Sequence, residues 1–344
     1  MTLLEGTRVL DLSRLLPGPL AAWHLQSAGA HVDKIESPGE GDYARSIGTR
    51  RKGAASSTFY ELLNAGKQVR VLDLKTAHDR DALLAEINRY DVLIESFRPG
   101  VMNRLGLGAD VLRKRAPRLV QVSVVGYGSD SPLAHAAGHD LNYLAHCGLL
   151  HEYLPAATDA EARLLLPNFQ WADVLGGAMS AAFAAVCGIW SAARTGQGCH
   201  IEVAMAEAMR LAAPMATAEA VAGACHASPG CGLLNGGVPC YDVYRCADGR
   251  WLALGALEHK FWAAFCEAIG RPDWIEQHWQ RGQAPGSVAA RALRAQVADV
   301  LAARTCAEWI AILAGSDCCA SEVRSLADVL AGQPLPGAVF RVRD

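Results

Sequence analysis

Short β-branched runs alternate with helical segments through the first 125 residues, and this alternation limits the fold more than any other feature of the sequence. The runs expected to form strands cover residues 7–13, 31–36, 68–73, 91–95 and 119–125. Apolar residues at helical spacing lie between them, over residues 18–29, 77–89 and 110–116. Strands and helices in alternation form βαβ units, so we predict an α/β fold with a Rossmann-like parallel sheet.

The second half of the chain predicts a different kind of unit. A long apolar helix is expected over 173–194, a strand over 199–203 and another helix over 205–222. Beyond a glycine-rich loop, residues 241–254 are typical of a hairpin that turns at Ala247-Asp-Gly249. Helical segments over 260–269, 288–303 and 307–313 follow, and together these elements predict a smaller α+β domain.

Charge and composition exclude several classes of protein. The 32 basic and 35 acidic residues give a net charge of −3, which does not favour binding to nucleic acid or to an anionic membrane. Glu5 and Arg8 interrupt the N-terminal apolar region, so we expect no signal peptide. The longest apolar stretch, 174–193, is rich in alanine and suits a helix buried in protein, so we expect no membrane-spanning helix.

Two further patterns limit the cofactors and the cellular location. The 11 cysteines form no CxxC pair and match no zinc-ligand spacing, which predicts reduced thiols in a cytoplasmic protein without a metal. The turn after the first expected strand is Leu15-Leu-Pro-Gly-Pro19 and not G-x-G-x-x-G. We therefore expect no NAD or FAD site of the usual kind.

Three places carry side chains suited to acid–base chemistry. His139 and Asp140 follow a glycine at an expected helix start, Asp173 begins the alanine-rich helix, and Glu258 lies between a strand and a helix. Each has a structural alternative, namely a buried histidine, a helix N-cap and a first-turn helix acid. Thirty-four residues separate His139 from Asp173, and no periodicity rule brings them together.

Two arginines follow the expected strand over 91–95. Arg98 and Arg104 lie where an open α/β sheet usually binds its ligand, and a guanidinium group suits phosphate. The structural alternative is a solvated loop.

The chain resembles the class III CoA-transferase superfamily, and within it the branch of α-methylacyl-CoA racemases. Eight segments carry this resemblance in the same order: Arg8-Val-Leu-Asp-Leu with Pro17-Gly-Pro, Leu72-Asp-Leu-Lys75, Asp91-Val-Leu-Ile-Glu-Ser-Phe-Arg-Pro-Gly-Val101, Arg104-Leu-Gly-Leu-Gly108, Gly138-His-Asp-Leu-Asn-Tyr143, Ala172-Asp-Val-Leu-Gly-Gly177, Thr195-Gly-Gln-Gly198, and Tyr241-Asp-Val-Tyr with Ala247-Asp-Gly249. Each segment alone is a weak signal, whereas eight in order are a strong one.

The resemblance implies a domain organisation and an assembly. It implies a large Rossmann-like domain over 1–222, to which residues from about 320 to 344 return, and a small α+β domain over 223–319. It also implies an interlocked homodimer.

The resemblance also implies an acyl-CoA substrate, with no cofactor beyond the coenzyme A that the substrate carries. It assigns His139 and Asp173 to the two sides of the substrate α-carbon and Glu258 to a hydrogen bond near the histidine. Contacts to CoA are expected from Arg98, Arg104, Lys34, Lys67, Leu72, Gly126, Tyr127, Asp140 and Tyr143. Related racemases carry an arginine where this chain has Ser37, and we therefore rely more on Arg98 and Arg104.

Three functions remain open within this resemblance. An epimerase would use His139 and Asp173 as proton carriers, with backbone N–H groups at the start of the Asp173 helix bonded to the enolate oxygen. A CoA-transferase would use Asp173 as a nucleophile and would not need the histidine. A catalytically silent CoA-binding protein would need only the arginines. The Gly-His-Asp segment favours the epimerase.

Overall fold

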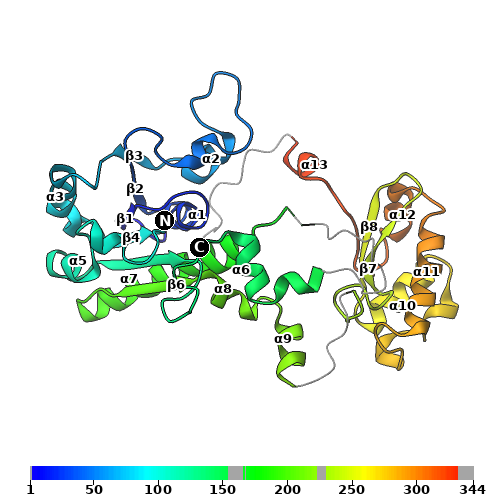
Figure 1. The fold of residues 1–344 in the computed structure, drawn as a ribbon. Helices are drawn as coiled ribbons and strands as arrows, with labels where there is room; N and C mark the ends of the chain where they lie inside the picture. Colours follow the sequence, from blue (N-terminus) through cyan, green and yellow to red (C-terminus); the bar gives the residue numbers. More distant parts are fainter. Residues whose placement is uncertain (1, 154–165, 167, 223–229, 332–344) are drawn as a thin grey trace. The chain divides into compact units, whose positions relative to one another are not determined.

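The computed structural model describes residues 2–153, 166, 168–222 and 230–331, and they form two compact units (Figure 1). Unit 1 contains the described residues of 1–150 and 167–217. Unit 2 contains those of 151–166 and 218–335. Each unit has a hydrophobic core of its own.

Unit 1 is built on a six-stranded sheet in the order β3-β2-β1-β4-β5-β6, with every neighbouring pair parallel. Its strands are β1 (Arg8–Asp11), β2 (His31–Glu36), β3 (Gln68–Val71), β4 (Val92–Glu95), β5 (Val120–Val125) and β6 (His200–Ala204). This arrangement confirms the predicted Rossmann-like sheet. The order also reverses direction between β1 and β4, which creates a crevice at the carboxyl ends of these two strands.

Helices cover both faces of this sheet (Figure 1). Helices α1 (Pro17–Ser27) and α7 (Ser180–Thr195) pack on one face, whereas α3 (Ala77–Glu86) and α5 (Ala109–Arg115) pack on the other. In β1, Val9 belongs to the first core and its neighbour Leu10 to the second. The central strands β4 and β5 are buried at every residue for this reason, as parallel strands usually are. The remaining helices of unit 1 are α2 (Thr58–Asn64), α4 (Val101–Arg104), α6 (Asp140–His146) and α8 (Met205–Ala208).

The helix predicted over 173–194 is present, but it begins as a π-helical segment, η4 (Ala172–Met179), before it continues as α7. Gly176 and Gly177 allow η4 to lie close to its neighbours. A Cβ atom on Gly176 would lie 2.7 Å from the carbonyl oxygen of Met205, and one on Gly177 would lie 2.7 Å from Cβ of Pro17. The predicted helix over 205–222 is divided into α8, a 3₁₀ turn and α9 (Pro214–Val221).

Unit 2 is an antiparallel sheet packed against helices. Strands β7 (Tyr241–Arg245) and β8 (Trp251–Gly255) form the predicted hairpin, and β9 (Ala320–Glu322) pairs with β8. The other elements are α10 (His259–Ala268), α11 (Val288–Leu301), α12 (Cys306–Leu313) and α13 (Leu326–Leu330). Because β9 completes this sheet, residues 320–322 belong to unit 2. The expected return of the chain to the large domain by residue 344 falls largely on residues outside those that the structure describes, and it stays a prediction.

The apolar helix over Ala172–Thr195 is long and apolar enough to cross a membrane by length and composition alone, whereas the sequence pattern led us to expect no such helix. Half of its most apolar window is buried within the protein. The buried part, which includes Ala181 and Ala185, packs into the core on the sheet.

Candidate active site

A cavity of about 700 Å³ opens in unit 1 at the carboxyl ends of β1, β4 and β5. This is the crevice that the strand order creates, and it is where open α/β sheets bind their ligands. The chain segments that follow these three strands supply much of the lining. The lining residues are Arg14, Leu15, Pro17, Tyr43, Ser96, Phe97, Arg98, Pro99, Val101, Arg104, Val124, Val125, Gly126, Ala134, Ala136, Ala137, Gly138, His139, Asn142, Tyr143, Asp173 and Met205.

Asp173 is the buried carboxyl group of this cavity. It lies in the first turn of η4, and only 8% of the residue is exposed. Burial, and then the negative charge of Asp140, raise the pKa of Asp173 to about 7. A carboxyl group with this pKa exists in both protonation states near neutral pH, so Asp173 can accept or deliver a proton.

Asp140 fixes the start of η4. Its carboxylate accepts a hydrogen bond from the backbone N–H of Asp173 at 3.0 Å and another from that of Ala172. The next N–H group, that of Val174, donates to the carbonyl oxygen of Gln170 at 2.8 Å. Acceptors within the chain already serve these three groups, and the expectation that N–H groups at the start of this helix bind an enolate oxygen stays a prediction.

His139 reaches the same cavity from a different element. It directly precedes α6, and its backbone N–H donates to Oδ1 of Asn142 at 3.1 Å. The side chain is exposed and lines the cavity together with Asp173. The structure thus brings together the two residues that spacing alone could not connect.

Arginines form the cationic part of the lining. Arg98 and Arg104 are both there, as expected, and Arg14 joins them. The Arg14 guanidinium lies 5.8 Å from the ring centroid of Phe97 and donates to Oγ of Ser37 at 3.3 Å. Among the described residues, none of the three has a carboxylate within ion-pair distance, so their charges are available to an anionic ligand.

Arg14 is a lining residue that we did not predict from the sequence, although a signal for it is present there. Arg14 follows β1, and β1 and β4 are neighbours at the point where the strand order reverses. A basic residue directly after β1 therefore meets the segment after β4 that carries Arg98.

The structure does not support CoA contacts from Lys34 and Lys67, because both side chains are fully buried. Lys67 Nζ donates to Oδ2 of Asp11 at 2.9 Å, to the carbonyl oxygen of Pro19 at 2.7 Å and to Oδ1 of Asn64 at 3.0 Å. Nζ of Lys34 donates to the carbonyl oxygen of Ser13 at 2.8 Å, and an oxygen of the Asp42 carboxylate lies 3.1 Å from it. We correct their assignment to a buried charge network beneath the cavity.

The other predicted CoA contacts divide between the lining and its surroundings. Gly126 and Tyr143 line the cavity, and the Tyr143 hydroxyl donates to the carbonyl oxygen of Gly138 at 2.7 Å. Tyr127 does not line it and instead packs in the core with its ring edge-on to that of Tyr143. Leu72 packs against the core on the other face of the sheet, so the structure brings neither Tyr127 nor Leu72 to this cavity.

Glu258 belongs to unit 2, where it precedes α10 and makes no capping hydrogen bond through its side chain. Its hydrogen bond near His139 stays a prediction. No group of three His, Cys, Asp or Glu residues that could hold a metal ion occurs in the part of the chain that the structure describes.

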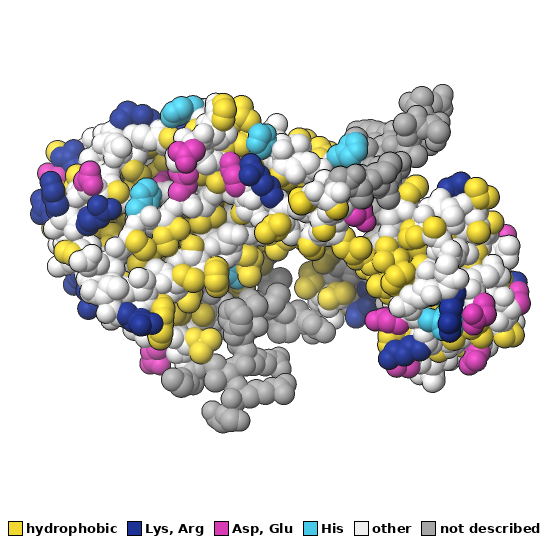
Figure 2. All heavy atoms as spheres, turned by 90° about the horizontal axis from the view of Figure 1, so that it is seen from below, with side chains coloured by type: hydrophobic (Ala, Val, Ile, Leu, Met, Phe, Trp, Pro, Cys, Tyr) yellow, Lys and Arg dark blue, Asp and Glu magenta, His cyan; other side chains and the backbone are white. Residues whose placement is uncertain are grey.

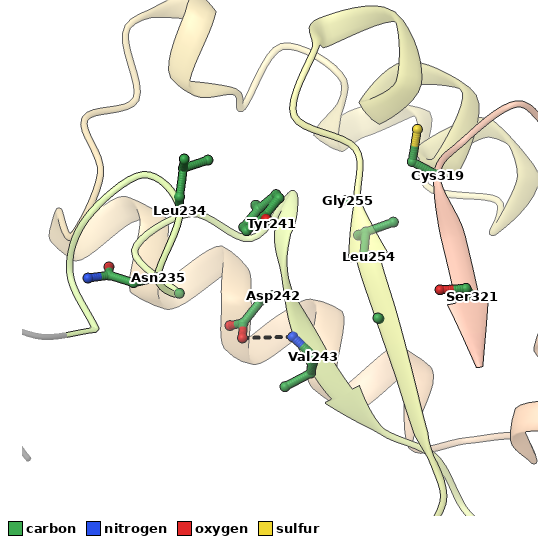
Figure 3. Close-up of a pocket in the computed structure, with 11 residues that line it drawn as sticks. Leu234, Asn235, Tyr241, Asp242, Val243, Leu254, Gly255, Cys319 and Ser321 are labelled. Atoms are coloured by element: carbon green, nitrogen blue, oxygen red, sulfur yellow. Dashed lines mark hydrogen bonds between the residues drawn. The ribbon is translucent and has the colours of Figure 1, made fainter. Parts of the chain in front are cut away.

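A second cavity, of about 400 Å³, lies in unit 2 (Figure 3). Side chains of β7, β8 and β9 and of the loop at Asn235 line it. Its one acidic side chain, Asp242, pairs with Arg294 and accepts a hydrogen bond from the N–H of Val243 at 2.8 Å. This cavity lacks a carboxyl group free for chemistry, so the unit 1 cavity is the candidate active site.

Relatives of known name match this chain over almost its whole length. The human alpha-methylacyl-CoA racemase is 32% identical over 328 residues, which cover 95% of this chain and 79% of that protein. The succinyl-CoA:glutarate CoA-transferase of Mus musculus is 29% identical over 334 residues, covering 95% and 73%. The crystal structure of Rv3272 from Mycobacterium tuberculosis aligns with a TM-score of 0.77 at 30% identity, over 96% of this chain and 86% of that one.

A family model agrees with these matches. It describes CoA-transferase family III and covers residues 4–336, a range that includes the whole candidate active site. The chain therefore belongs to CoA-transferase family III.

Proposed function

We propose that this chain epimerises 2-methylacyl-CoA thioesters, with His139 and Asp173 as its two proton carriers. The observation that carries the proposal is that both residues line one cavity, in which burial and Asp140 raise the pKa of Asp173 to about 7. Racemase relatives at about 30% identity over 95% of the chain support the same function.

The proton balance of the reaction is simple. Neutral His139 removes the proton from the carbon next to the thioester, and the electron pair of the C–H bond moves into an enolate. Protonated Asp173 then delivers a proton to the opposite face of that carbon, which leaves His139 protonated and Asp173 ionised. Because each turnover exchanges the protonation states of the two groups, the same pair serves the reverse direction with the roles exchanged.

The arginines of the cavity bind the CoA part of the substrate. Arg14, Arg98 and Arg104 line the cavity without carboxylate partners among the described residues. Guanidinium groups form charge-assisted hydrogen bonds to phosphate oxygens, and CoA carries several phosphate groups. We assign these three residues to the phosphates, in place of Lys34 and Lys67.

A CoA-transferase is the second candidate, and the transferases among the relatives favour it. In that reaction the Asp173 carboxylate attacks the thioester carbon, the C–S bond breaks, and CoA leaves as a thiolate from an acyl anhydride. The thiolate then attacks the aspartyl carbonyl of the anhydride, which releases the carboxylic acid and leaves an aspartyl-CoA thioester. His139 has no necessary part in these steps.

A homodimer is part of the proposal and is supported by an apolar surface on the helix that begins with η4. Leu175, Met179, Phe183, Val186 and Trp190 follow each other at helical spacing, and Phe183 and Trp190 are 72% and 66% exposed. Figure 2 shows hydrophobic side chains gathered on the lower side of unit 1, where α7 lies in Figure 1. Large contiguous apolar patches of this kind usually mark protein interfaces, and we assign this one to a second copy of the chain.

The test of the function is isotope exchange. One epimer of a 2-methylacyl-CoA is incubated with the protein in deuterated water, without any free carboxylic acid. The epimerase produces the other epimer and incorporates deuterium at the α-carbon. A transferase leaves the α-carbon unlabelled and forms a new thioester only when a carboxylic acid is added, a result that would replace the first candidate by the second.

A further inference from the structure

Both candidate reactions place negative charge on the same atom, the oxygen of the substrate thioester. Removal of the α-proton gives an enolate oxygen, and attack of a carboxylate on the thioester gives a tetrahedral oxyanion. A hydrogen-bond donor aimed at this oxygen stabilises either transition state. The N–H groups of Ala172, Asp173 and Val174 already have acceptors within the chain, which directs attention to donors in other parts of the cavity.

Tyr43 enters the cavity on a turn that a buried carboxylate holds in place. It begins a 3₁₀ turn, Tyr43–Ser46, and the preceding residue, Asp42, is fully buried. The Asp42 carboxylate accepts hydrogen bonds from the N–H of Ala44 at 2.9 Å and from that of Leu15 at 3.1 Å. It also pairs with Lys34 at 3.1 Å. The backbone next to Tyr43 is therefore anchored in the buried charge network.

The same carboxylate holds a second part of the cavity wall in an unusual conformation. Leu15 lines the cavity with a φ of 70°, a left-handed value that side chains other than glycine rarely adopt. Strained backbone persists where its surroundings hold it, and such positions are common at functional sites. Asp42 thus fixes two adjoining residues of the cavity, Leu15 and Tyr43, relative to each other.

Two tyrosines line the cavity, Tyr43 and Tyr143, and the Tyr43 hydroxyl is the one that has no acceptor among the described residues. Tyr43 lines the cavity together with Asp173 and is 45% exposed, and no described residue accepts a hydrogen bond from its hydroxyl. The Tyr143 hydroxyl, by contrast, already donates to Gly138. Partial burial, and then the negative charges of Asp42 and Asp173, raise the pKa of the Tyr43 phenol, although Arg14 opposes them. The phenol stays protonated at neutral pH and can donate.

We propose that Tyr43 donates a hydrogen bond to the thioester oxygen of the substrate and stabilises the charge that develops there. The inference rests on the proposed chemistry at Asp173, and it holds for the enolate and for the tetrahedral oxyanion alike. Tyr43 neither forms nor breaks a covalent bond, and its proton stays on the phenol throughout.

The test compares Tyr43→Phe with a matched control, Tyr90→Phe. Tyr90 is a buried tyrosine outside the cavity lining, and its hydroxyl donates to Asp33 at 2.7 Å. For each protein, kcat and KM are measured in whichever of the two assays the wild-type protein supports, and binding of CoA alone is measured by calorimetry. Tyr43→Phe is expected to lower kcat by about 10²-fold while CoA affinity is unchanged, because one oxyanion donor is lost. Tyr90→Phe is expected to keep the wild-type kcat.

Two results would overturn the assignment while leaving the proposed function intact. Tyr43→Phe with the kcat of the wild-type protein would show that a group other than Tyr43 donates the hydrogen bond to the thioester oxygen. A change confined to KM or to CoA affinity would make Tyr43 part of the binding wall only. A wild-type protein that is inactive in both assays would contradict the proposed function, and this inference with it.

Discussion

The carboxylate of Asp140 accepts a hydrogen bond from the backbone N–H of Asp173, at 3.0 Å. One contact therefore has two effects on the reacting carboxyl group. It holds the first turn of η4 in place, and it sets a negative charge beside Asp173, where that charge helps to raise the pKa of Asp173 to about 7.

Asp140→Asn separates these two effects. The amide keeps an oxygen that can accept the N–H bonds, but it removes the charge that raises the pKa of Asp173. We expect the limb of the pH–rate profile that reports Asp173 to move to lower pH, with a smaller loss of maximal rate than in Asp140→Ala. A profile of Asp140→Asn that superimposes on the wild-type profile would show that the Asp140 charge does not act on the reacting group.

Replacement of Asp173 predicts a gain in stability with a defined pH dependence. The folded-state pKa is about 7 and the ordinary aspartate value is 3.8, so the folded protein binds more protons than the unfolded chain between these values. Stability contributed by this carboxyl group therefore falls as pH rises from about 4 to 7. Asp173→Asn removes the ionised form and is expected to unfold at a higher temperature than wild type at about pH 8, by an amount worth at most ~4 kcal/mol.

The difference between Asp173→Asn and wild type is expected to shrink toward zero at about pH 4, where both side chains are neutral. Thermal unfolding followed by circular dichroism at several pH values measures it. Equal unfolding temperatures across the whole range would mean that the Asp173 carboxylate is well solvated in the folded protein.

Replacing a cavity arginine is expected to weaken CoA binding, whereas replacing the buried lysine is expected to lower folding stability. Arg14→Ala and Arg98→Ala remove cations that line the cavity without a carboxylate partner among the described residues, so they should weaken the binding of CoA and of every acyl-CoA by a similar factor, with little change in unfolding temperature. Lys67→Met leaves the buried carboxylate of Asp11 with one cation fewer. Breaking a buried pair in this way costs about 3 to 5 kcal/mol of stability.

Calorimetric CoA titrations and thermal unfolding of the three variants decide between these roles. Folded Lys67→Met should bind CoA as the wild-type protein does. Loss of CoA binding in that variant, with unchanged unfolding temperature, would show that Lys67 binds the CoA phosphates after all.

The exposed apolar helix predicts that assembly depends on its large side chains. Trp190→Glu and Phe183→Glu place a charge within the proposed interface, where burial of an unpaired charge is costly. Sedimentation velocity is expected to show a dimer for the wild-type chain and loss of that dimer in the variants. A monomeric wild-type protein with unchanged variants would assign this face to a different partner.

The alternation of strands and helices was sufficient to predict the parallel sheet, because the strands of unit 1 are short segments with β-branched residues that alternate with helical segments. The third strand of unit 2, Ala320–Glu322, escaped prediction because it has three residues and no apolar alternation. A strand so short is defined by its partner β8 and not by its own sequence.

The functional residues were predictable to different extents for physical reasons. His139 and Asp173 carry chemistry that the sequence shows, but their proximity depends on the tertiary fold. Lys34 lies on β2, between β1 and β3. A lysine on an interior strand of the sheet is expected to be buried, so its charge pairs with groups inside the protein and not with a ligand. The bond from Asp173 to Asp140 spans 33 positions, and no local pattern encodes it.

The measurement that tests the central claim most directly is α-proton exchange in deuterated water by His139→Gln beside the wild-type protein. If His139 and Asp173 are the two proton carriers, the wild-type protein scrambles a single epimer of a 2-methylacyl-CoA and labels its α-carbon. His139→Gln is expected to lose about 10² to 10⁴-fold of that rate and to keep its CoA affinity. A folded His139→Gln protein that labels and epimerises at the wild-type rate would contradict the account.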